Sequence, residues 1–117
     1  MAVIAIQKNY ATVCTMSSGA TLSAAVDLQA VYGRVYLDCP SLPSGSLFVH
    51  GSSDNSTFRR IYGADPNQGD PWTLTSPVVQ NGGLFQIPPG FQYYKVENSS
   101  GVTQTIKTFS FIGVMNK

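Results

Sequence analysis

Apolar and polar residues alternate with a period of two along most of this chain. In residues 33–38, for example, Val35 and Leu37 are separated by polar or amphipathic neighbours. This alternation is typical of an extended strand, which directs successive side chains to opposite faces. No stretch carries apolar residues at positions i, i+3, i+4 and i+7 over three turns, so the pattern favours strands over helices.

Segments with this pattern follow one another at short spacing, separated by Gly, Pro, Asn and Ser. The predicted strands are residues 21–28, 33–38, 46–51, 58–62, 72–79, 84–87, 93–97 and 103–114. The run Asn81-Gly82-Gly83 predicts a hairpin turn. We therefore predict an all-β chain that forms a single β-sandwich of jelly-roll or galactose-binding-like type, with seven to nine short antiparallel strands.

The length of 117 residues suits one domain and is too short for two ordinary ones. Residues 21–117 form the predicted sandwich domain. Residues 1–20 are less clearly patterned, and two interpretations stay open: an N-terminal arm, or a first strand followed by a loop. As an arm, this segment would add a strand to a neighbouring subunit, with Ile4, Ile6 and Tyr10 as anchors on one side.

Charged residues make up only 11% of the chain, and the net charge is +1. About a quarter of residues is usual, so Ser, Thr, Asn, Gln and Gly must form much of the surface. Such a surface costs little to desolvate, because burying hydroxyl groups that find partners is cheaper than burying charges. This composition favours a protein packed against neighbours in an assembly, and it also suits a glycan-binding module.

The same composition argues against several classes of partner. The basic residues are scattered, and only Arg59 and Arg60 are adjacent, so we expect no nucleic-acid partner. No window is long and apolar enough to span a bilayer, so we expect no membrane partner. The N-terminal segment lacks the basic region and long apolar stretch of a secretion signal, so we expect synthesis in the cytoplasm.

No set of residues with catalytic spacing is evident. His50 is the only histidine, and the nearby Ser52 and Asp54 lie in a turn without a G-x-S-x-G motif. Cys14 and Cys39 are predicted to be two buried, reduced thiols, and a single histidine does not complete a zinc site with them. We therefore expect no enzymatic activity, no metal and no cofactor.

Two aromatic residues, Tyr62 and Trp72, are candidates for a platform that stacks against a sugar or a partner. Asp65, Asn67 and Asp70 lie close to them in sequence and would supply polar contacts. Aromatic residues of a small sandwich more often belong to the core or to an interface. A carbohydrate-binding module is therefore kept as the alternative function.

Several segments resemble a known group of proteins. They are SGATLSAAVDL at residues 18–28, GSSDNSTFRRIY at 51–62, FQYYKVENS at 91–99, and the strand at 104–115. This order is similar to that of small structural proteins of tailed bacteriophages with jelly-roll or galactose-binding-like sandwiches. The group's pattern has glycine where this chain has Gln29 and Asn55; asparagine tolerates the left-handed conformation that glycine would supply.

The resemblance implies a virion structural protein, most specifically a capsid cement or decoration protein. Such a protein is made in the host cytoplasm, binds the major capsid protein at capsomer junctions on the capsid surface, and stabilises the head shell. The resemblance also implies self-association, as a homotrimer by analogy with proteins at three-fold positions. A tail or neck component involved in host attachment is an alternative within the virion.

Overall fold

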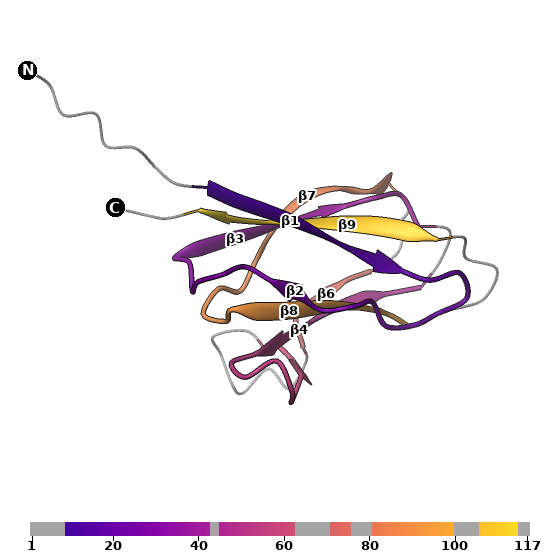
Figure 1. The fold of residues 1–117 in the computed structure, drawn as a ribbon. Helices are drawn as coiled ribbons and strands as arrows, with labels where there is room; N and C mark the ends of the chain where they lie inside the picture. Colours follow the sequence, from indigo (N-terminus) through magenta and orange to yellow (C-terminus); the bar gives the residue numbers. More distant parts are fainter. Residues whose placement is uncertain (1–8, 43–44, 63–70, 76–80, 100–105, 115–117) are drawn as a thin grey trace, which may run out of the picture.

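The computed structural model describes residues 9–42, 45–62, 71–75, 81–99 and 106–114. These residues form nine elements, all of them strands: β1 (Asn9–Met16), β2 (Val26–Asp27), β3 (Arg34–Cys39), β4 (Leu47–Ser52), β5 (Arg59–Arg60), β6 (Thr73–Leu74), β7 (Gly83–Ile87), β8 (Tyr93–Asn98) and β9 (Lys107–Val114). The strands form two antiparallel sheets that face each other (Figure 1). The predicted all-β sandwich is thereby confirmed.

The strand order is that of a jelly roll. The first sheet has the order β1-β9-β3-β7, and the second has the order β2-β8-β4-β5, with β6 also paired to β4. The pairs are nested along the chain: β1 with β9, β2 with β8, β3 with β7, and β4 with β5. This wrapped, nested pairing is characteristic of jelly rolls. It brings the start of β1 and the end of β9 together at one end of the sandwich (Figure 1).

The core lies between the two sheets and follows the predicted alternation. Burial alternates along β3, β4, β8 and β9, so that one side chain in two points inward. The largest fully buried side chains come from both sheets and from the adjoining loops: Tyr94, Phe109, Phe111, Met16, Leu28, Leu37, Leu42, Leu47, Ile87, Val35 and Val49.

Both cysteines belong to this core, as predicted. Cys14 and Cys39 are buried and are not bonded to each other. Burial raises the pKa of both thiols, and for Cys39 burial, with a smaller contribution from the charge of Asp38, raises the pKa to about 12. Neutral thiols pack as small apolar side chains.

The N-terminal part of the described chain is a strand of the sandwich. β1 pairs with β9 from Asn9 to Met16, and it buries Cys14 and Met16 in the core. Residues 9–16 are thus a first strand followed by a loop, which is one of the two interpretations left open for residues 1–20. Tyr10, one of the three anchor candidates, lies in β1 and packs partly against the core. The other two arm candidates, Ile4 and Ile6, lie outside the described residues.

The strand predicted for residues 21–28 is shorter in the structure. Only β2 and an isolated bridge between Leu22 and Glu97 pair with β8. Between them, the Ser23 hydroxyl accepts a hydrogen bond from the Val96 N–H at 2.9 Å, in place of a backbone carbonyl. The next residue, Ala24, donates its N–H to the Thr15 carbonyl of β1 at 3.2 Å. The segment is thus bonded to both sheets as the chain crosses between them, which interrupts regular pairing.

The hairpin predicted at Asn81-Gly82-Gly83 is absent from the described strands. β6 pairs with β4 in the second sheet, whereas β7 pairs with β3 in the first. Gly82 has a φ of +71°, and a Cβ at this position would lie 2.8 Å from the Cys39 carbonyl oxygen. Glycine is therefore needed here because the backbone passes close to the end of β3, and not because two adjacent strands turn back on each other.

Two non-glycine residues adopt a left-handed backbone conformation in the described chain. They are Gln29, with φ of 71°, and Asn55, with φ of 60°. The Gln29 N–H donates to the Asp27 carboxylate at 2.7 Å, which stabilises its turn. Asparagine tolerates this conformation well, whereas glutamine is strained in it.

Replacing Gln29 with glycine is therefore expected to stabilise the fold. Relief of the strain should exceed the extra entropy of an unfolded glycine and raise the free energy of unfolding by about 0.5–1 kcal/mol. Urea unfolding of Gln29→Gly measures this change. The matched control, Asn55→Gly, should change stability by a few tenths of a kcal/mol at most. A lower stability of Gln29→Gly than of the parent would contradict the assignment of strain.

Candidate functional site

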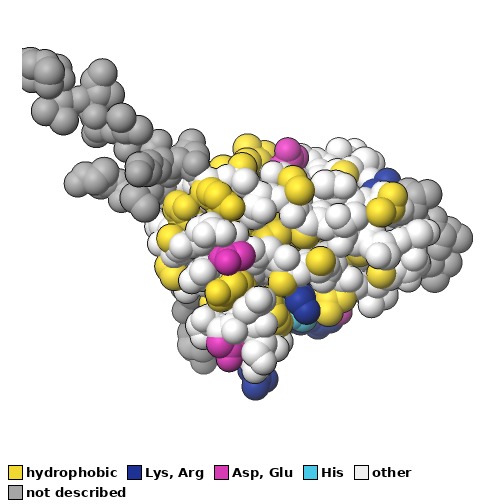
Figure 2. All heavy atoms as spheres, viewed as in Figure 1, with side chains coloured by type: hydrophobic (Ala, Val, Ile, Leu, Met, Phe, Trp, Pro, Cys, Tyr) yellow, Lys and Arg dark blue, Asp and Glu magenta, His cyan; other side chains and the backbone are white. Residues whose placement is uncertain are grey.

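The outer faces of the two sheets differ in chemistry. The outer side chains of the first sheet form what we call the aliphatic face: Ala11, Val13 and Thr15 of β1, Thr108, Ser110, Ile112 and Val114 of β9, Arg34, Tyr36 and Asp38 of β3, and Leu84 and Gln86 of β7. In Figure 2 hydrophobic side chains and white atoms cover most of the upper part of the molecule, where this sheet lies, with an acidic group at the top and a basic group at the upper right, while the histidine and further basic groups lie lower down.

Cross-strand register makes the aliphatic face continuous. One row runs Val13, Ser110, Asp38 and Leu84, and the next runs Ala11, Ile112, Tyr36 and Gln86. Val13 and Leu84 are each 61% exposed, which leaves most of two aliphatic side chains in water. The charged residues of this face, Arg34 and Asp38, both lie on β3.

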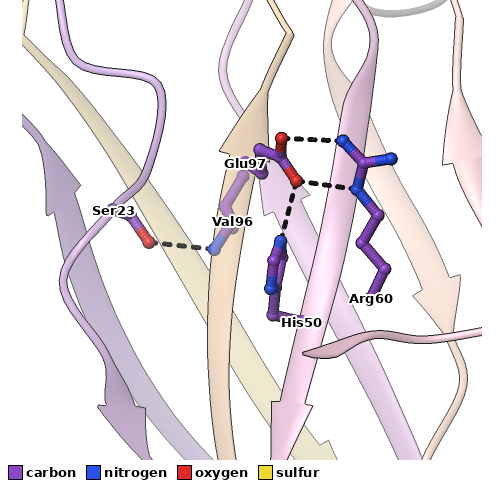
Figure 3. A network of polar contacts seen from close by, with 5 residues as sticks. All are labelled: Ser23, His50, Arg60, Val96 and Glu97. Carbon is purple, nitrogen blue, oxygen red and sulfur yellow. Dashed lines mark hydrogen bonds and ion pairs between the residues drawn. The ribbon is translucent and has the colours of Figure 1, made fainter. Parts of the chain in front are cut away.

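The outer face of the second sheet carries a charged cluster centred on Glu97 of β8. Arg60 of β5 donates to both carboxylate oxygens of Glu97, from Nε to Oε1 at 2.9 Å and from Nη2 to Oε2 at 2.8 Å. His50 of β4 places its Nε2 2.8 Å from Glu97 Oε1 (Figure 3). The three side chains meet because β4 lies between β8 and β5, where His50 is opposite both Lys95 and Arg60.

Aromatic rings flank this cluster and engage its cations. The guanidinium of Arg60 lies 3.9 Å from the centre of the Phe48 ring, and the ammonium of Lys95 lies 4.5 Å from the centre of the Phe58 ring. Both distances are within the range of cation–π attraction. The charges of this face are therefore compensated inside the protein, and removing water from them would cost more than it would on the aliphatic face.

Ser52, His50 and Asp54, which were considered from the sequence as a Ser-His-Asp set, are not joined by hydrogen bonds into one chain. His50 bonds to Glu97, whereas the Ser52 hydroxyl donates to Asp54 at 2.9 Å. Within the described residues, no three His, Cys, Asp or Glu side chains form a metal-binding group. Nor does the described chain include a helix of the length and apolar character needed to cross a membrane.

A cleft of about 640 Å³ opens beside the end of β4, at the end of the sandwich where β1 starts. Its apolar lining comes from Ile61, Tyr62, Pro88, Pro89 and Phe91, and the rest of its lining comes from residues 51–54, Thr57, Arg59 and Arg60. The connection from β4 to β5 and the loop before β8 lie on its two sides because Ser52, which ends β4, pairs with Tyr93, which starts β8.

The two predicted platform residues are placed differently. Tyr62 is 53% exposed and lines the cleft. Trp72 packs partly against the core, donates its backbone N–H to the Ile61 carbonyl, and is not part of the cleft lining. Their expected polar partners Asp65, Asn67 and Asp70 lie outside the described residues.

Sequence patterns did not reveal the Glu97 cluster or the apolar walls of the cleft. Glu97 and Arg60 are 37 residues apart, and only the strand order brings them together. Nothing in the pattern around Pro88 and Pro89 indicated that they line a cleft together with Tyr62. The pairing register of a jelly roll would have placed Glu97 near Arg60, but that register can be assigned only once the strand order is known.

The Glu97 cluster predicts a specific acid sensitivity. Hydrogen bonds from Arg60, and to a smaller degree from His50, lower the Glu97 pKa from 4.5 to about 2. A carboxyl whose pKa is lower in the folded state stabilises the fold above its unfolded pKa, and this contribution is lost as the pH falls. The urea midpoint of the parent should therefore fall between about pH 4.5 and pH 2, and this part of the fall should be absent in Glu97→Gln.

Arg60→Gln provides the control for this interaction. It removes the main cause of the lowered pKa and should reduce the pH dependence without abolishing it, because His50 remains. Equal pH dependence of the parent and Glu97→Gln would show that the ion pair contributes nothing to stability in acid.

Comparisons with protein-family models, with curated proteins and with solved structures find no match to this chain. Function must therefore be inferred from its own surfaces. Two of them are suited to binding: the aliphatic face, which offers a broad area at a low cost of desolvation, and the cleft, which offers a concave site with apolar walls and polar groups.

Proposed function

We propose that this protein is a virion structural protein, most specifically a decoration protein that binds the major capsid protein and stabilises the head shell. The observation that carries the proposal is the aliphatic face of the first sheet. Jelly rolls are found in viral capsid domains, among other proteins. The sequence resemblance to small phage structural proteins supports the same function.

The aliphatic face has the properties of a surface buried in an assembly. Val13, Leu84 and the partly exposed Ile112 would each leave water on binding, and the accompanying Thr and Ser hydroxyls are cheap to desolvate once hydrogen-bonded. The compensated charges of the second sheet lie on the opposite side of the sandwich. The aliphatic face is thus the side that we expect to meet the shell.

The size of this face sets the expected strength of one contact. A strand of eight residues is about 27 Å long and four strands span roughly 19 Å, so the face covers on the order of 500 Å². A standard stable interface buries about 800 Å² per partner. One copy is therefore expected to bind weakly. A homotrimer, the state implied by the resemblance, would strengthen binding through multivalency.

The proposal includes no enzymatic role. His50 and Glu97 are engaged with each other and with Arg60, in a cluster that stabilises the outer face of the second sheet. A tail or neck protein would use the same kind of face, and the partner that is bound distinguishes the two.

Binding to shells assembled from the major capsid protein of the same phage tests the proposal. We expect saturable binding that raises the temperature at which the shells open. Val13→Lys should weaken this binding by about tenfold or more, corresponding to at least ~1.4 kcal/mol, because it would bury an unpaired ammonium group. Sedimentation of protein with shells measures the occupancy.

Val31→Lys is the matched control. Val31 is 59% exposed, against 61% for Val13, but it lies in the loop between β2 and β3, outside the strands of the aliphatic face. It should bind shells like the parent. Equal binding by Val13→Lys and the parent would contradict the assigned face. Binding to tails and not to shells would assign the protein to the tail or neck.

A further inference from the structure

We propose that the cleft beside β4 is a binding site for a neutral sugar ring of a glycan. The site is distinct from the aliphatic face, and the inference does not depend on shell binding. Three features of the cleft point to such a ligand: a floor held in place by the core, a polar turn whose carboxylate has an oxygen with no described partner, and an arginine with no described ion-pair partner.

The floor of the cleft is built around Gly51 and Phe91. A Cβ at Gly51 would lie 2.7 Å from two atoms of the Phe91 ring, so the ring rests directly on the backbone of β4. Phe91 also meets Tyr94 edge-on, with ring centres 6.1 Å apart and an interplanar angle of 88°. The Tyr94 hydroxyl in turn donates to the Pro88 carbonyl at 3.2 Å. Floor and proline wall are thus held by the core before any ligand binds, which reduces the entropy cost of binding.

The polar side of the cleft is a turn fixed by its own hydrogen bonds. Asp54 Oδ1 accepts from the Ser52 hydroxyl and from the N–H groups of Ser56 and Thr57, at 2.9–3.0 Å. The same backbone bonds, that from Thr57 first, lower the Asp54 pKa, so the group is a carboxylate at neutral pH. No described residue bonds to Oδ2, which leaves this oxygen as an acceptor for a ligand.

Arg59 supplies the complementary donor. It lies opposite Gly51 in the pairing of β5 with β4, and its side chain is exposed and lines the cleft. No described carboxylate pairs with Arg59, whereas its neighbour Arg60 is bonded to Glu97. Among the described residues, Arg59 is thus the basic group of the cleft lining that holds no carboxylate.

These groups select a neutral polyol over other ligands. A carboxylate only accepts hydrogen bonds and a guanidinium only donates them, whereas a sugar hydroxyl does both and can satisfy either group. Asp54 and Arg59 balance in charge, so the polar side of the cleft has no net charge that would favour an ionic ligand over a neutral one. The C–H face of a sugar ring is apolar and suits the exposed Tyr62 ring and the Pro88–Pro89 wall. A volume of about 640 Å³ is within the usual range of ligand pockets.

The test is binding of the purified chain to an array of neutral and acidic bacterial surface glycans. We expect binding to at least one neutral glycan, followed by titration of that glycan with NMR detection. The shifted amide signals should include Ser53, Asp54 and Phe91. Tyr62→Ala and Arg59→Ala should each weaken the affinity by at least tenfold while leaving the urea midpoint near that of the parent, since both side chains are exposed.

Control variants separate this site from the aliphatic face. Tyr36→Ala removes a partly exposed tyrosine of the aliphatic face, and with Val13→Lys it should leave glycan affinity unchanged. Conversely, Tyr62→Ala should leave shell binding unchanged. Binding to no neutral glycan, binding to acidic glycans alone, or full affinity in Tyr62→Ala would each overturn the proposal.

Discussion

The packing of Tyr94 between the two sheets is the interaction on which the rest of the structure depends. Its ring, fully buried on β8, stacks on Phe111 of β9 with centres 5.5 Å apart, which joins the second sheet to the first. Burial raises the Tyr94 pKa to about 12, so the hydroxyl keeps its proton and its bond to the Pro88 carbonyl. The same ring also contacts Phe91, which lines the cleft. One side chain therefore both joins the two sheets and supports the cleft.

The few charged side chains of this protein are distributed unequally between the outer faces of the two sheets. Glu97 gathers Arg60 and His50 on the second sheet, where two hydrogen bonds from one guanidinium fix the geometry of the pair. The first sheet is left with a broad surface of aliphatic and hydroxyl side chains. Removing water from the outer face of the first sheet would therefore cost less than removing it from the outer face of the second.

Strands with clear two-fold alternation could be predicted from the sequence; those at 33–38, 46–51 and 93–97 agree with β3, β4 and β8 to within about a residue. The bounds of β1 were not predicted, because apolar residues occupy both of its faces: Val13 points outward, whereas Cys14 and Met16 point into the core. A glycine with positive φ, such as Gly82, is found both in hairpin turns and where two backbones pass close to each other. The sequence alone does not distinguish these two cases. Of the cleft, Tyr62 was predicted as a platform, but its relation to Phe91 and Arg59 depends on pairing between distant strands.

The central claim is that the aliphatic face is the surface this protein buries in its assembly. Hydroxyl-radical footprinting of the free and the shell-bound protein tests it most directly, because oxidation reports the exposure of each side chain. The account predicts that labelling of Tyr36 and Leu84 falls on binding while labelling of Tyr62 persists. Loss of labelling at Phe48 and Phe58 on the opposite sheet, with Leu84 unchanged, would contradict it.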